Sequence, residues 1–431
     1  MADIPRPVPI PGGRLNRLAR LGGLATGIAG RAAVDSGRAV LSGRRPDPRD
    51  LFLTPQNINR ITQQLAQMRG AAMKVGQMLS MEASDVLPPE LAEILARLRA
   101  DADYMPPKQL RAALAGALGD DFQRRFRSLD PRPVAAASIG QVHRAVTRDG
   151  RDIALKVQYP GVTRSIDSDV RNVGALIRMT GMIPKGMDIS PLLEAARAQL
   201  HEEADYTREA EQLAAFGTRL AGDPRFLVPG VHADLSSRTV LAMDFVESTP
   251  LEETDRGQAV TEALIWLFLT ELFDWHAMQT DPNFANYRWQ ADTGRIVLLD
   301  FGAARSFDPA AMAPYRDLLR AGFAEDDRAV IAALRDLGFL GESTPERAEG
   351  VILDLFRTAF SPVTALSHDF ATCKMVEQLR AAGMDLVDDR GTFPLPPADA
   401  LFIQRKIGGM YLLAKRLGAT VDLGAIVTPF R

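Results

Sequence analysis

The sequence predicts an α+β protein with two lobes, a smaller lobe built on a β-sheet and a larger lobe made mainly of helices. Short apolar segments separated by turn residues fill residues 133–158, a pattern typical of neighbouring strands. From Asp255 onward the apolar spacing is mostly that of helices. A third observation is an apolar strand, Ile296–Leu299, that runs directly into Asp300. The length of 431 residues exceeds what one hydrophobic core usually supports, so two or three structural units are expected.

The strand before Asp300 completes a pattern that is typical of phosphoryl-transfer centres in protein-kinase-like folds. Asp281 lies five residues before Asn286, and the strand then ends in Asp300, Phe301 and Gly302. This D-x-x-x-x-N and D-F-G arrangement supplies one carboxylate that orients or deprotonates the attacking group. It also supplies a carboxylate and an amide oxygen that hold divalent metal ions. The two motifs together predict a phosphoryl-transfer centre.

We expect four regions along the chain. Residues 1–50 form a basic segment rich in Pro, Gly and Arg, with nine Arg against four Asp. Residues 51–130 form a helical extension, and residues 131–250 form the sheet-containing lobe with inserted acidic helices. Residues 251–431 form the helical lobe, which holds the catalytic and D-F-G loops.

Composition excludes several classes of site. A single cysteine, Cys373, rules out a disulfide framework and a cysteine zinc site, and the five scattered histidines show no ligand-like pair. The net charge is −3 and the body of the chain is acidic, so no nucleic-acid partner is expected. No run of about 18 apolar residues exists, which predicts no transmembrane helix, and the basic residues 1–50 suit contact with anionic lipid.

The extension is predicted to contain a helix from Asn57 to Met81, because its apolar residues repeat at alternating threes and fours. Gly70, Lys74 and Gln77 lie on a second face of this helix. A polar line that contains a glycine predicts either a face that meets another part of the protein or a solvated face. A proline pair at residues 106–107 predicts the start of a further helix.

In the first lobe the pattern predicts a strand, a tight turn and a strand, followed by a strand at Asp152–Gln158 that carries Lys156 at its centre. A lysine at this place in a kinase-like lobe binds the α- and β-phosphates of a nucleotide. The turn before it would cover the phosphates, and such turns are usually rich in glycine. Alanine dominates the turn in this sequence and should make it less adaptable. The residues of this turn are Ala135, Ala136, Ala137, Ser138, Ile139 and Gly140.

Pro191–Ala221 is predicted to be one long acidic helix. A kinase-like lobe needs a helical carboxylate that pairs with Lys156, and we expect Glu209 first and Glu203 second. The acids expected on one face of this helix are Glu202, Asp205 and Glu209.

Arg238–Val246 is predicted to be the last strand of the first lobe, leading into a hinge whose backbone groups would hold adenine. Met243 would lie near the residue that gates the adenine pocket, with Val246 at the hinge. Soon after Gly302 the chain enters a helix, with no A-P-E motif and no long segment for docking a peptide. This pattern argues against a protein substrate.

Six motifs follow one another between residues 55 and 310. They are Lys74-Val-Gly-Gln77, Ala135-Ala-Ala-Ser-Ile-Gly-Gln141, Ala154-Leu-Lys-Val-Gln-Tyr-Pro-Gly161, Glu203-Ala-Asp205 with Arg208-Glu-Ala210, Thr280-Asp-Pro-Asn-Phe-Ala-Asn286 and Leu299-Asp-Phe-Gly-Ala303. In type and order they resemble the motifs of the ABC1/UbiB atypical kinase-like family, most closely those of its COQ8/ADCK (AarF-type) branch.

The resemblance implies a bilobal protein-kinase-like fold with an N-terminal helical K-x-G-Q extension, and an ATPase that supports ubiquinone (coenzyme Q) biosynthesis at a membrane surface. ATP or ADP with Mg²⁺ or Mn²⁺ would be bound. The implied partners are membrane lipids or quinone precursors and quinone-biosynthesis proteins, and a homodimer is left open. The implied location is cytoplasmic, peripherally on the inner membrane. A protein or small-molecule kinase and a nucleotide-binding scaffold without turnover are the alternatives.

Carried over residue by residue, the resemblance assigns the main roles at the centre. Lys156 is the phosphate-binding lysine and Glu209 its helical partner. Asp281 is the acid of the catalytic loop, and Asn286 and Asp300 are the metal ligands.

The resemblance also implies a regulatory contact. The K-x-G-Q segment would pack over the site, so that Lys74 and Gln77 face Glu203 and Asp205 in a closed-state latch. In the hinge, Ser248 occupies a position where the family usually carries glycine, which changes the expected shape of the adenine pocket.

Overall fold

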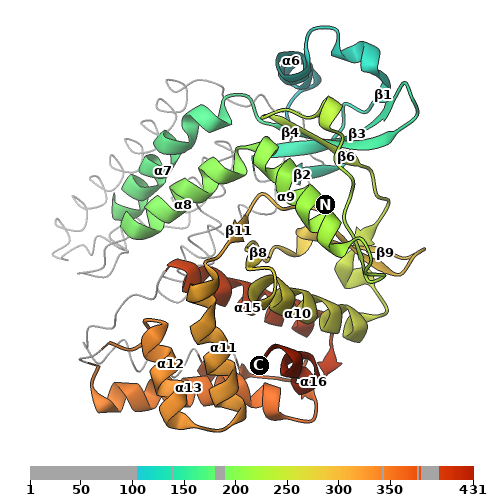
Figure 1. Cartoon of the computed structure of the whole chain (residues 1–431). Helices are drawn as coiled ribbons and strands as arrows, with labels where there is room; N and C mark the ends of the chain where they lie inside the picture. Colours follow the sequence, from blue (N-terminus) through green and yellow to red (C-terminus); the bar gives the residue numbers. More distant parts are fainter. Residues whose placement is uncertain (1–103, 138, 180–189, 342–343, 376–377, 380–397) are drawn as a thin grey trace, which may run out of the picture. The chain divides into compact units, whose positions relative to one another are not determined.

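The computed structural model describes residues 104–137, 139–179, 190–341, 344–375, 378–379 and 398–431 (Figure 1). These residues divide into two compact units. The first unit extends to Phe216 and also includes Pro229–Phe245, and the second consists of Gly217–Val228 and Val246–Arg431.

Several expectations fall outside the described residues. They concern residues 1–50, the helix at Asn57–Met81 with Lys74 and Gln77, and Ser138 in the alanine-rich turn.

The first unit is built on an antiparallel sheet of five strands (Figure 1). Its strands are β1 (Phe126–Leu129), β2 (Ala135–Ala137), β3 (Gly140–Thr147), β4 (Asp152–Gln158) and β6 (Val240–Asp244). β4 lies between β3 and β6, and both β1 and β2 pair with the other edge of β3. The predicted strand–turn–strand order and the strand at residues 152–158 are confirmed, and Gly150 makes the turn between β3 and β4 with a φ of 95°.

Four helices accompany this sheet. They are α6 (Pro107–Leu118), α7 (Val162–Met179), α8 (Ser190–Glu203) and α9 (Tyr206–Leu220), with the short 3-10 helices η1 (Phe122–Arg125) and η2 (Ala233–Leu235). α6 begins at the predicted proline pair and buries Leu110, Leu114 and Leu118. These leucines repeat every four residues, so they form one apolar stripe that packs against β4 in the core of the unit.

The single long helix predicted at Pro191–Ala221 is wrong, because the chain breaks between α8 and α9. The Asp205 carboxylate accepts the backbone N–H groups of Thr207 and Arg208, at 3.1 and 3.4 Å. An aspartate that bonds to backbone N–H groups ahead of it favours the start of a new helix over continuation of the old one. The acidic face predicted to run up to Glu209 therefore does not form across the break.

The second unit contains more strands than its mainly helical sequence pattern predicts. They are β5 (Phe226–Leu227), β7 (Thr249–Pro250), β8 (Ala277–Gln279), β9 (Tyr287–Gln290), β10 (Arg295–Leu298), β11 (Ala304–Ser306), β12 (His368–Asp369) and β13 (Thr420–Val421). β10 runs parallel to β5 and antiparallel to β9, and β7 pairs with the far edge of β9. β8 pairs with β11, and β12 pairs with β13. The strand predicted at Ile296–Leu299 is β10, displaced by one residue.

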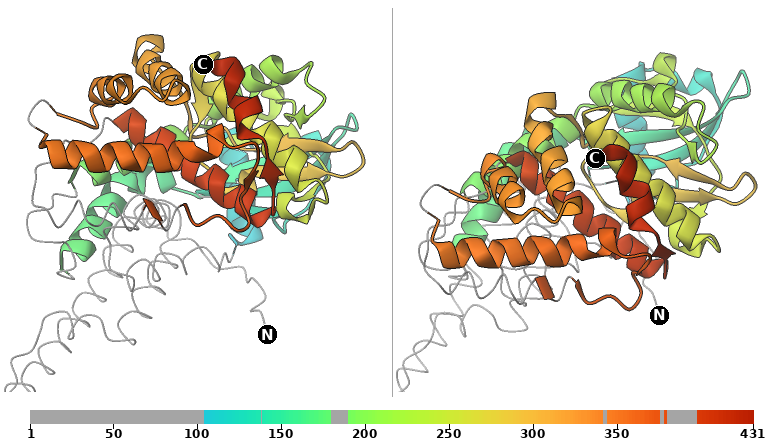
Figure 2. Two further views of the ribbon diagram at one scale, coloured as in Figure 1. Left: turned by 90° about the horizontal axis from the view of Figure 1, so that it is seen from below. Right: turned by 60° about the horizontal axis from the view of Figure 1, so that its bottom comes forward.

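One buried helix organises the rest of the second unit. The helices are α10 (Gly257–Phe273), α11 (Pro309–Phe323), α12 (Asp327–Asp336), α13 (Glu346–Thr364), α15 (Ala398–Arg416) and α16 (Leu423–Val427), with η3 (Leu251–Glu253), η4 (Phe284–Asn286) and η5 (Thr428–Phe430). α10 is apolar on all sides, as expected for a helix inside a core, and α15, α16 and β8 pack on it. The C-terminal end of α13 packs against α16 (Figure 2). Within the described part of the chain, no helix has both the length and the apolar character needed to cross a bilayer.

Replacing Gly140 with alanine should destabilise the first unit. A Cβ atom at Gly140 would lie 2.4 Å from the Val157 carbonyl oxygen and 2.9 Å from the Tyr206 hydroxyl. Relieving this overlap should lower the free energy of unfolding by about 1–3 kcal/mol, measured by urea denaturation. Gly116→Ala in α6 is the matched control, since a Cβ atom at Gly116 would have no neighbour within 4 Å. Equal stability of the two variants would contradict the close approach at Gly140.

Candidate functional site

β4 brings Lys156 against the first turn of α9. The Lys156 Nζ atom donates to Glu209 Oε1 at 2.6 Å, and the two side chains are only 8% and 2% exposed. Lys156 also lies 5.2 Å from the centre of the Tyr206 ring. Glu209 stands in the first turn of its helix, where the helix dipole favours a carboxylate. Lys156 therefore pairs with Glu209, the first of the two partners expected from the sequence.

Glu203 and Asp205 have other partners. Glu203, at the end of α8, accepts a hydrogen bond from Gln199 Nε2 at 2.9 Å. Asp205 caps α9 and pairs with Arg238, whose Nε lies 3.5 Å from Asp205 Oδ2. The latch in which these two acids face the K-x-G-Q segment stays a prediction, because that segment lies outside the described residues.

The alanine-rich turn is a short β-hairpin with a buried anchor. Ala135–Ala137 form β2 and pair in register with the first residues of β3. Ile139 is 1% exposed, and its carbonyl accepts the Tyr159 N–H at 2.9 Å. Ile139 therefore belongs to the core, whereas Ala135 and Ala136 are exposed. Where a glycine-rich loop would offer bare backbone, β2 exposes Ala135 and Ala136.

Of the residues expected near adenine, Met243 lies in the sheet, whereas Val246 lies in the hinge. Met243 lies on β6, buried, opposite Ala154 of β4. The Val246 carbonyl accepts the Ser248 hydroxyl at 3.2 Å. The Ser248 carbonyl in turn accepts Arg288 Nη2 at 2.5 Å. Ser248, the residue in place of the usual hinge glycine, is therefore held by hydrogen bonds through both its side chain and its backbone.

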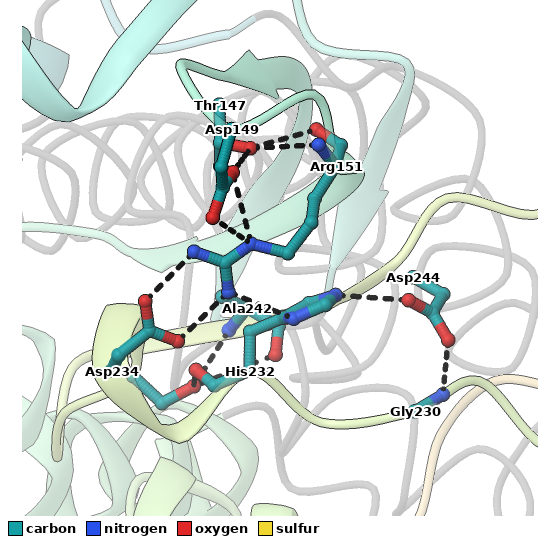
Figure 3. A network of polar contacts seen from close by, with 9 residues as sticks. Thr147, Asp149, Arg151, Gly230, His232, Asp234, Ala242 and Asp244 are labelled. Atoms are coloured by element: carbon teal, nitrogen blue, oxygen red, sulfur yellow. Dashed lines mark hydrogen bonds and ion pairs between the residues drawn. The ribbon is translucent and has the colours of Figure 1, made fainter.

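A polar network connects the β3–β4 turn to the end of β6 (Figure 3). Arg151 donates to both carboxylate oxygens of Asp234 at 2.9 Å and to His232 Nδ1 at 3.2 Å. His232 Nε2 lies 2.9 Å from Asp244 Oδ1, and the other Asp244 oxygen accepts the Gly230 N–H at 2.8 Å. Since arginine only donates and a carboxylate only accepts, the hydrogen of neutral His232 is on Nε2. The bond from Arg151 holds the pKa of Asp234 below its ordinary value.

A second network, which the sequence analysis did not identify, lies behind the alanine-rich hairpin. Gln141 Oε1 accepts the Met105 N–H at 2.9 Å, and Gln141 Nε2 lies 2.7 Å from His143 Nε2. His143 Nδ1 lies 2.8 Å from the Asp130 carbonyl, so Nδ1 carries the hydrogen and Nε2 accepts from the amide. Burial lowers the pKa of His143, which keeps its ring neutral. In the sequence, only Gln141, the last residue of the alanine-rich motif, pointed to this buried network.

In the second unit, the segment Thr280–Asn286 joins β8 to β9 and carries Asp281. Asn286 closes this segment, because its amide nitrogen donates to the Asp281 carbonyl at 3.4 Å. The backbone carbonyl of Asn286 accepts the Leu299 N–H at 3.0 Å. The Asn283 side chain caps the short helix η4 within the segment. We call Thr280–Asn286 the catalytic segment.

The D-F-G turn lies beside the catalytic segment. Asp300 Oδ1 accepts the Gly302 N–H at 2.9 Å, which fixes the turn. The Asp300 carbonyl accepts Gln279 Nε2 at 3.2 Å. The Ala303 carbonyl accepts both the N–H and the hydroxyl of Thr280, at 3.3 and 2.8 Å. Together with the β8–β11 pairing, these bonds keep the two loops side by side.

Asn286 and Asp300 suit a hard divalent cation that arrives with a nucleotide. The Asn286 amide nitrogen donates within the segment, so its carbonyl oxygen is the atom that can ligate a metal. The described residues contain no group of three or more His, Cys, Asp or Glu able to hold a metal ion by themselves. Mg²⁺ commonly takes one or two carboxylates and completes its shell with phosphates and water. The donor set fits that arrangement.

The stability difference between the wild type and His143→Gln should depend on pH. The folded state keeps His143 neutral, whereas the unfolded chain takes up a proton below a pH of about 6.5, so the wild type loses stability as pH falls through that value. Glutamine lacks this titration, and the advantage of the wild type should shrink from pH 8 to pH 5 in urea unfolding. His201→Gln, at an exposed histidine of α8 whose Nε2 lies 2.9 Å from Asp167 Oδ1, shows how much pH dependence comes from replacing a histidine outside the core. A difference that stays constant over this range would contradict the neutral buried ring.

Comparison with known proteins gives one family. The model of the ABC1 atypical kinase-like domain matches residues 97–334. The mitochondrial atypical kinase coq-8 of Caenorhabditis elegans is 36% identical over 97% of this chain, which spans 57% of that protein. The mitochondrial atypical kinases COQ8 of Saccharomyces cerevisiae and COQ8B of Rattus norvegicus are each 35% identical, and the chain covers 83% and 81% of their lengths.

A solved structure has a similar fold. The Rv3197–erythromycin complex from Mycobacterium tuberculosis superimposes with a TM-score of 0.61 at 25% identity, covering 87% of this chain and 95% of that one. The family match confirms the α+β protein-kinase-like fold class. The chain therefore belongs to the ABC1 atypical kinase-like family, and its similarity to the COQ8 atypical kinases extends over nearly its whole length.

Proposed function

We propose that this protein binds ATP together with a divalent metal ion and acts as an ATPase that supports ubiquinone biosynthesis at a membrane surface. The observation that carries the proposal is the set of hydrogen bonds that holds the catalytic segment beside the D-F-G turn. These bonds bring the oxygen groups of Asp281, Asn286 and Asp300 onto neighbouring loops. Similarity to the COQ8 atypical kinases supports the connection with quinone synthesis.

In this proposal Lys156 holds the α- and β-phosphates of the nucleotide. Glu209 keeps the ammonium in place through the 2.6 Å ion pair, so that the lysine side chain is already ordered before a phosphate binds. The alanine-rich hairpin covers the phosphates, and its anchor Ile139 limits its movement. Because these groups are already ordered, nucleotide binding should cost little side-chain entropy.

Asp281 orients the attacking water or hydroxyl and accepts its proton, while Asn286 and Asp300 hold the metal ion. When bound, the ion neutralises charge on the phosphates. The protein's own contribution is to keep the two metal-binding side chains in fixed positions. Asp300 is fixed by the Gly302 N–H and Asn286 by its bond to the catalytic segment.

The connection after the D-F-G turn favours water or a small acceptor over a peptide. β11 follows directly at Ala304–Ser306, and α11 begins at Pro309 with Asp308 as its cap. A protein kinase uses a long segment here to hold a peptide substrate. The short connection leaves no length for such a segment, which supports ATPase activity over protein phosphorylation.

Asp300→Asn should abolish the metal dependence of nucleotide binding and lower ATP turnover by about 10²-fold or more. The physical reason is that a neutral amide is a much weaker ligand for Mg²⁺ than a carboxylate. Phosphate release and calorimetric titration of ATP, each with and without Mg²⁺, measure the two effects. Asp292→Asn, at an exposed position of the β9–β10 turn, is the matched control. Intact Mg²⁺-dependent binding and turnover in Asp300→Asn would refute the proposal.

A quinone profile tests the biological part of the proposal. A strain that lacks the gene should accumulate quinone precursors and make less ubiquinone, and the wild-type gene should restore the profile. Asp281→Asn should fail to restore it, because the carboxylate that orients the attacking group is gone. Full restoration by Asp281→Asn would show that turnover is not needed for the support of quinone synthesis.

A further inference from the structure

A lysine ammonium is buried in the second unit, beneath the catalytic segment. Lys406 of α15 is 3% exposed. Its Nζ atom donates to the Gln279 carbonyl at 2.8 Å and to the Tyr287 hydroxyl at 2.7 Å. The Glu271 carboxylate of α10 lies 3.8 Å away, within ion-pair range and beyond hydrogen-bond distance. An ammonium has three donors, and these three groups surround it.

The two hydrogen-bond partners of Lys406 lie at the two ends of the catalytic segment. Gln279 is the last residue of β8, and Tyr287 is the first residue of β9. Everything between them is Thr280–Asn286, with Asp281 near its beginning. One buried ammonium therefore ties together the points where the segment leaves one strand and enters the next.

Neighbouring residues of α15 contact the same segment. Arg405 donates from Nη2 and Nε to the Thr280 carbonyl, at 2.9 and 3.2 Å. One turn further along, a Cβ atom at Gly409 would lie 2.1 Å from Pro282 Cβ, so only glycine allows α15 to lie this close. Three positions of one helix thus hold the backbone just before and just after Asp281.

The groups around Lys406 favour a charged lysine over an arginine at this position. Burial raises the pKa of Glu271 to about 7 and raises the pKa of Tyr287, so the tyrosine is a neutral acceptor. Burial alone would lower the pKa of Lys406, but Tyr287, Glu271 and the nearby Asp281 outweigh it. A compact ammonium fits this group of acceptors, whereas the planar fork of arginine is built for a different geometry.

We propose that Lys406 is a positioning residue of the phosphoryl-transfer centre, which holds Asp281 and Asn286 in place by joining the two ends of the catalytic segment. The inference rests on the proposed function, because it gives Lys406 a role in the chemistry of that same site. The inference predicts that loss of the Lys406 hydrogen bonds lowers ATP turnover even when the stability of the fold is restored.

The test compares Lys406→Met with the double variant Lys406→Met/Glu271→Gln. The single variant removes the cation that lowers the pKa of Glu271. The acid is then either buried charged without its partner or takes up a proton on folding, and either cost should lower the melting temperature. The double variant removes both charges and should melt close to the wild type, as expected for a neutralised buried pair. Its kcat should nevertheless stay lower by about 10–10²-fold, with KM for ATP within about threefold of the wild type. Recovery of kcat together with stability would overturn the proposal and leave Lys406 a structural role only.

Hydrogen exchange of the backbone amides in residues 280–287 gives a readout that does not need turnover. Exchange should be faster in the double variant than in the wild type. Lys415→Met is the matched control, since Lys415 lies on the same helix and donates to the Cys373 carbonyl at 3.5 Å, and it should leave exchange and kcat unchanged. If the wild type shows no metal-dependent turnover but the double variant still exchanges faster, the proposed function fails and the mechanical role of Lys406 stands. Unchanged exchange in the double variant would sink the positioning role itself.

Discussion

A lysine ammonium that is taken out of water must be surrounded by oxygen acceptors, because its desolvation costs several kcal/mol. Each unit of this protein contains such a lysine, Lys156 in the first and Lys406 in the second. Glu209 satisfies Lys156, and this fixes the first turn of α9 against β4. Gln279 and Tyr287 satisfy Lys406. In both units a buried cation thus sets the geometry of the residues proposed to handle the nucleotide.

The second unit adds a further constraint in the proposed function, because the oxygen groups of Asp281, Asn286 and Asp300 lie on loops that must stay ordered beside each other. Loops alone would cost conformational entropy each time they were ordered. The hydrogen bonds from Thr280 to Ala303 and from Gln279 to Asp300 offset this loss of entropy when the protein folds. Arg405 and Lys406 of α15 add hydrogen bonds to the Thr280 and Gln279 carbonyls. If these residues handle the nucleotide as proposed, the segment is ordered before the nucleotide binds, which favours electrostatic catalysis.

Local sequence signals predicted much of this structure. The strand at residues 152–158 followed from a short apolar segment after a turn, and the start of α6 followed from a proline pair; the structure has both. The pairing of Lys156 with Glu209 required knowledge of a kinase-like site, since the two residues are 53 positions apart. The break at Asp205 was missed because a single capping carboxylate outweighed an apolar pattern that continued through it. Apart from β10, the strands of the second unit were missed because two to four residues are too few to show alternation. Lys406 was missed because its partners lie more than 100 positions away in the sequence.

In the proposed function, Asn286 and Asp300 are two members of a metal shell that nucleotide phosphates complete. Electron paramagnetic resonance of Mn²⁺ tests this most directly, because free and bound ions give different signals. Titration of the protein with Mn²⁺ alone should show weak binding, since the described residues supply too few ligands for a cage of their own. Addition of ATP should convert this to tight binding of the ion at the protein. Equal Mn²⁺ binding with and without ATP, or no ion retained by the protein in either case, would contradict the account.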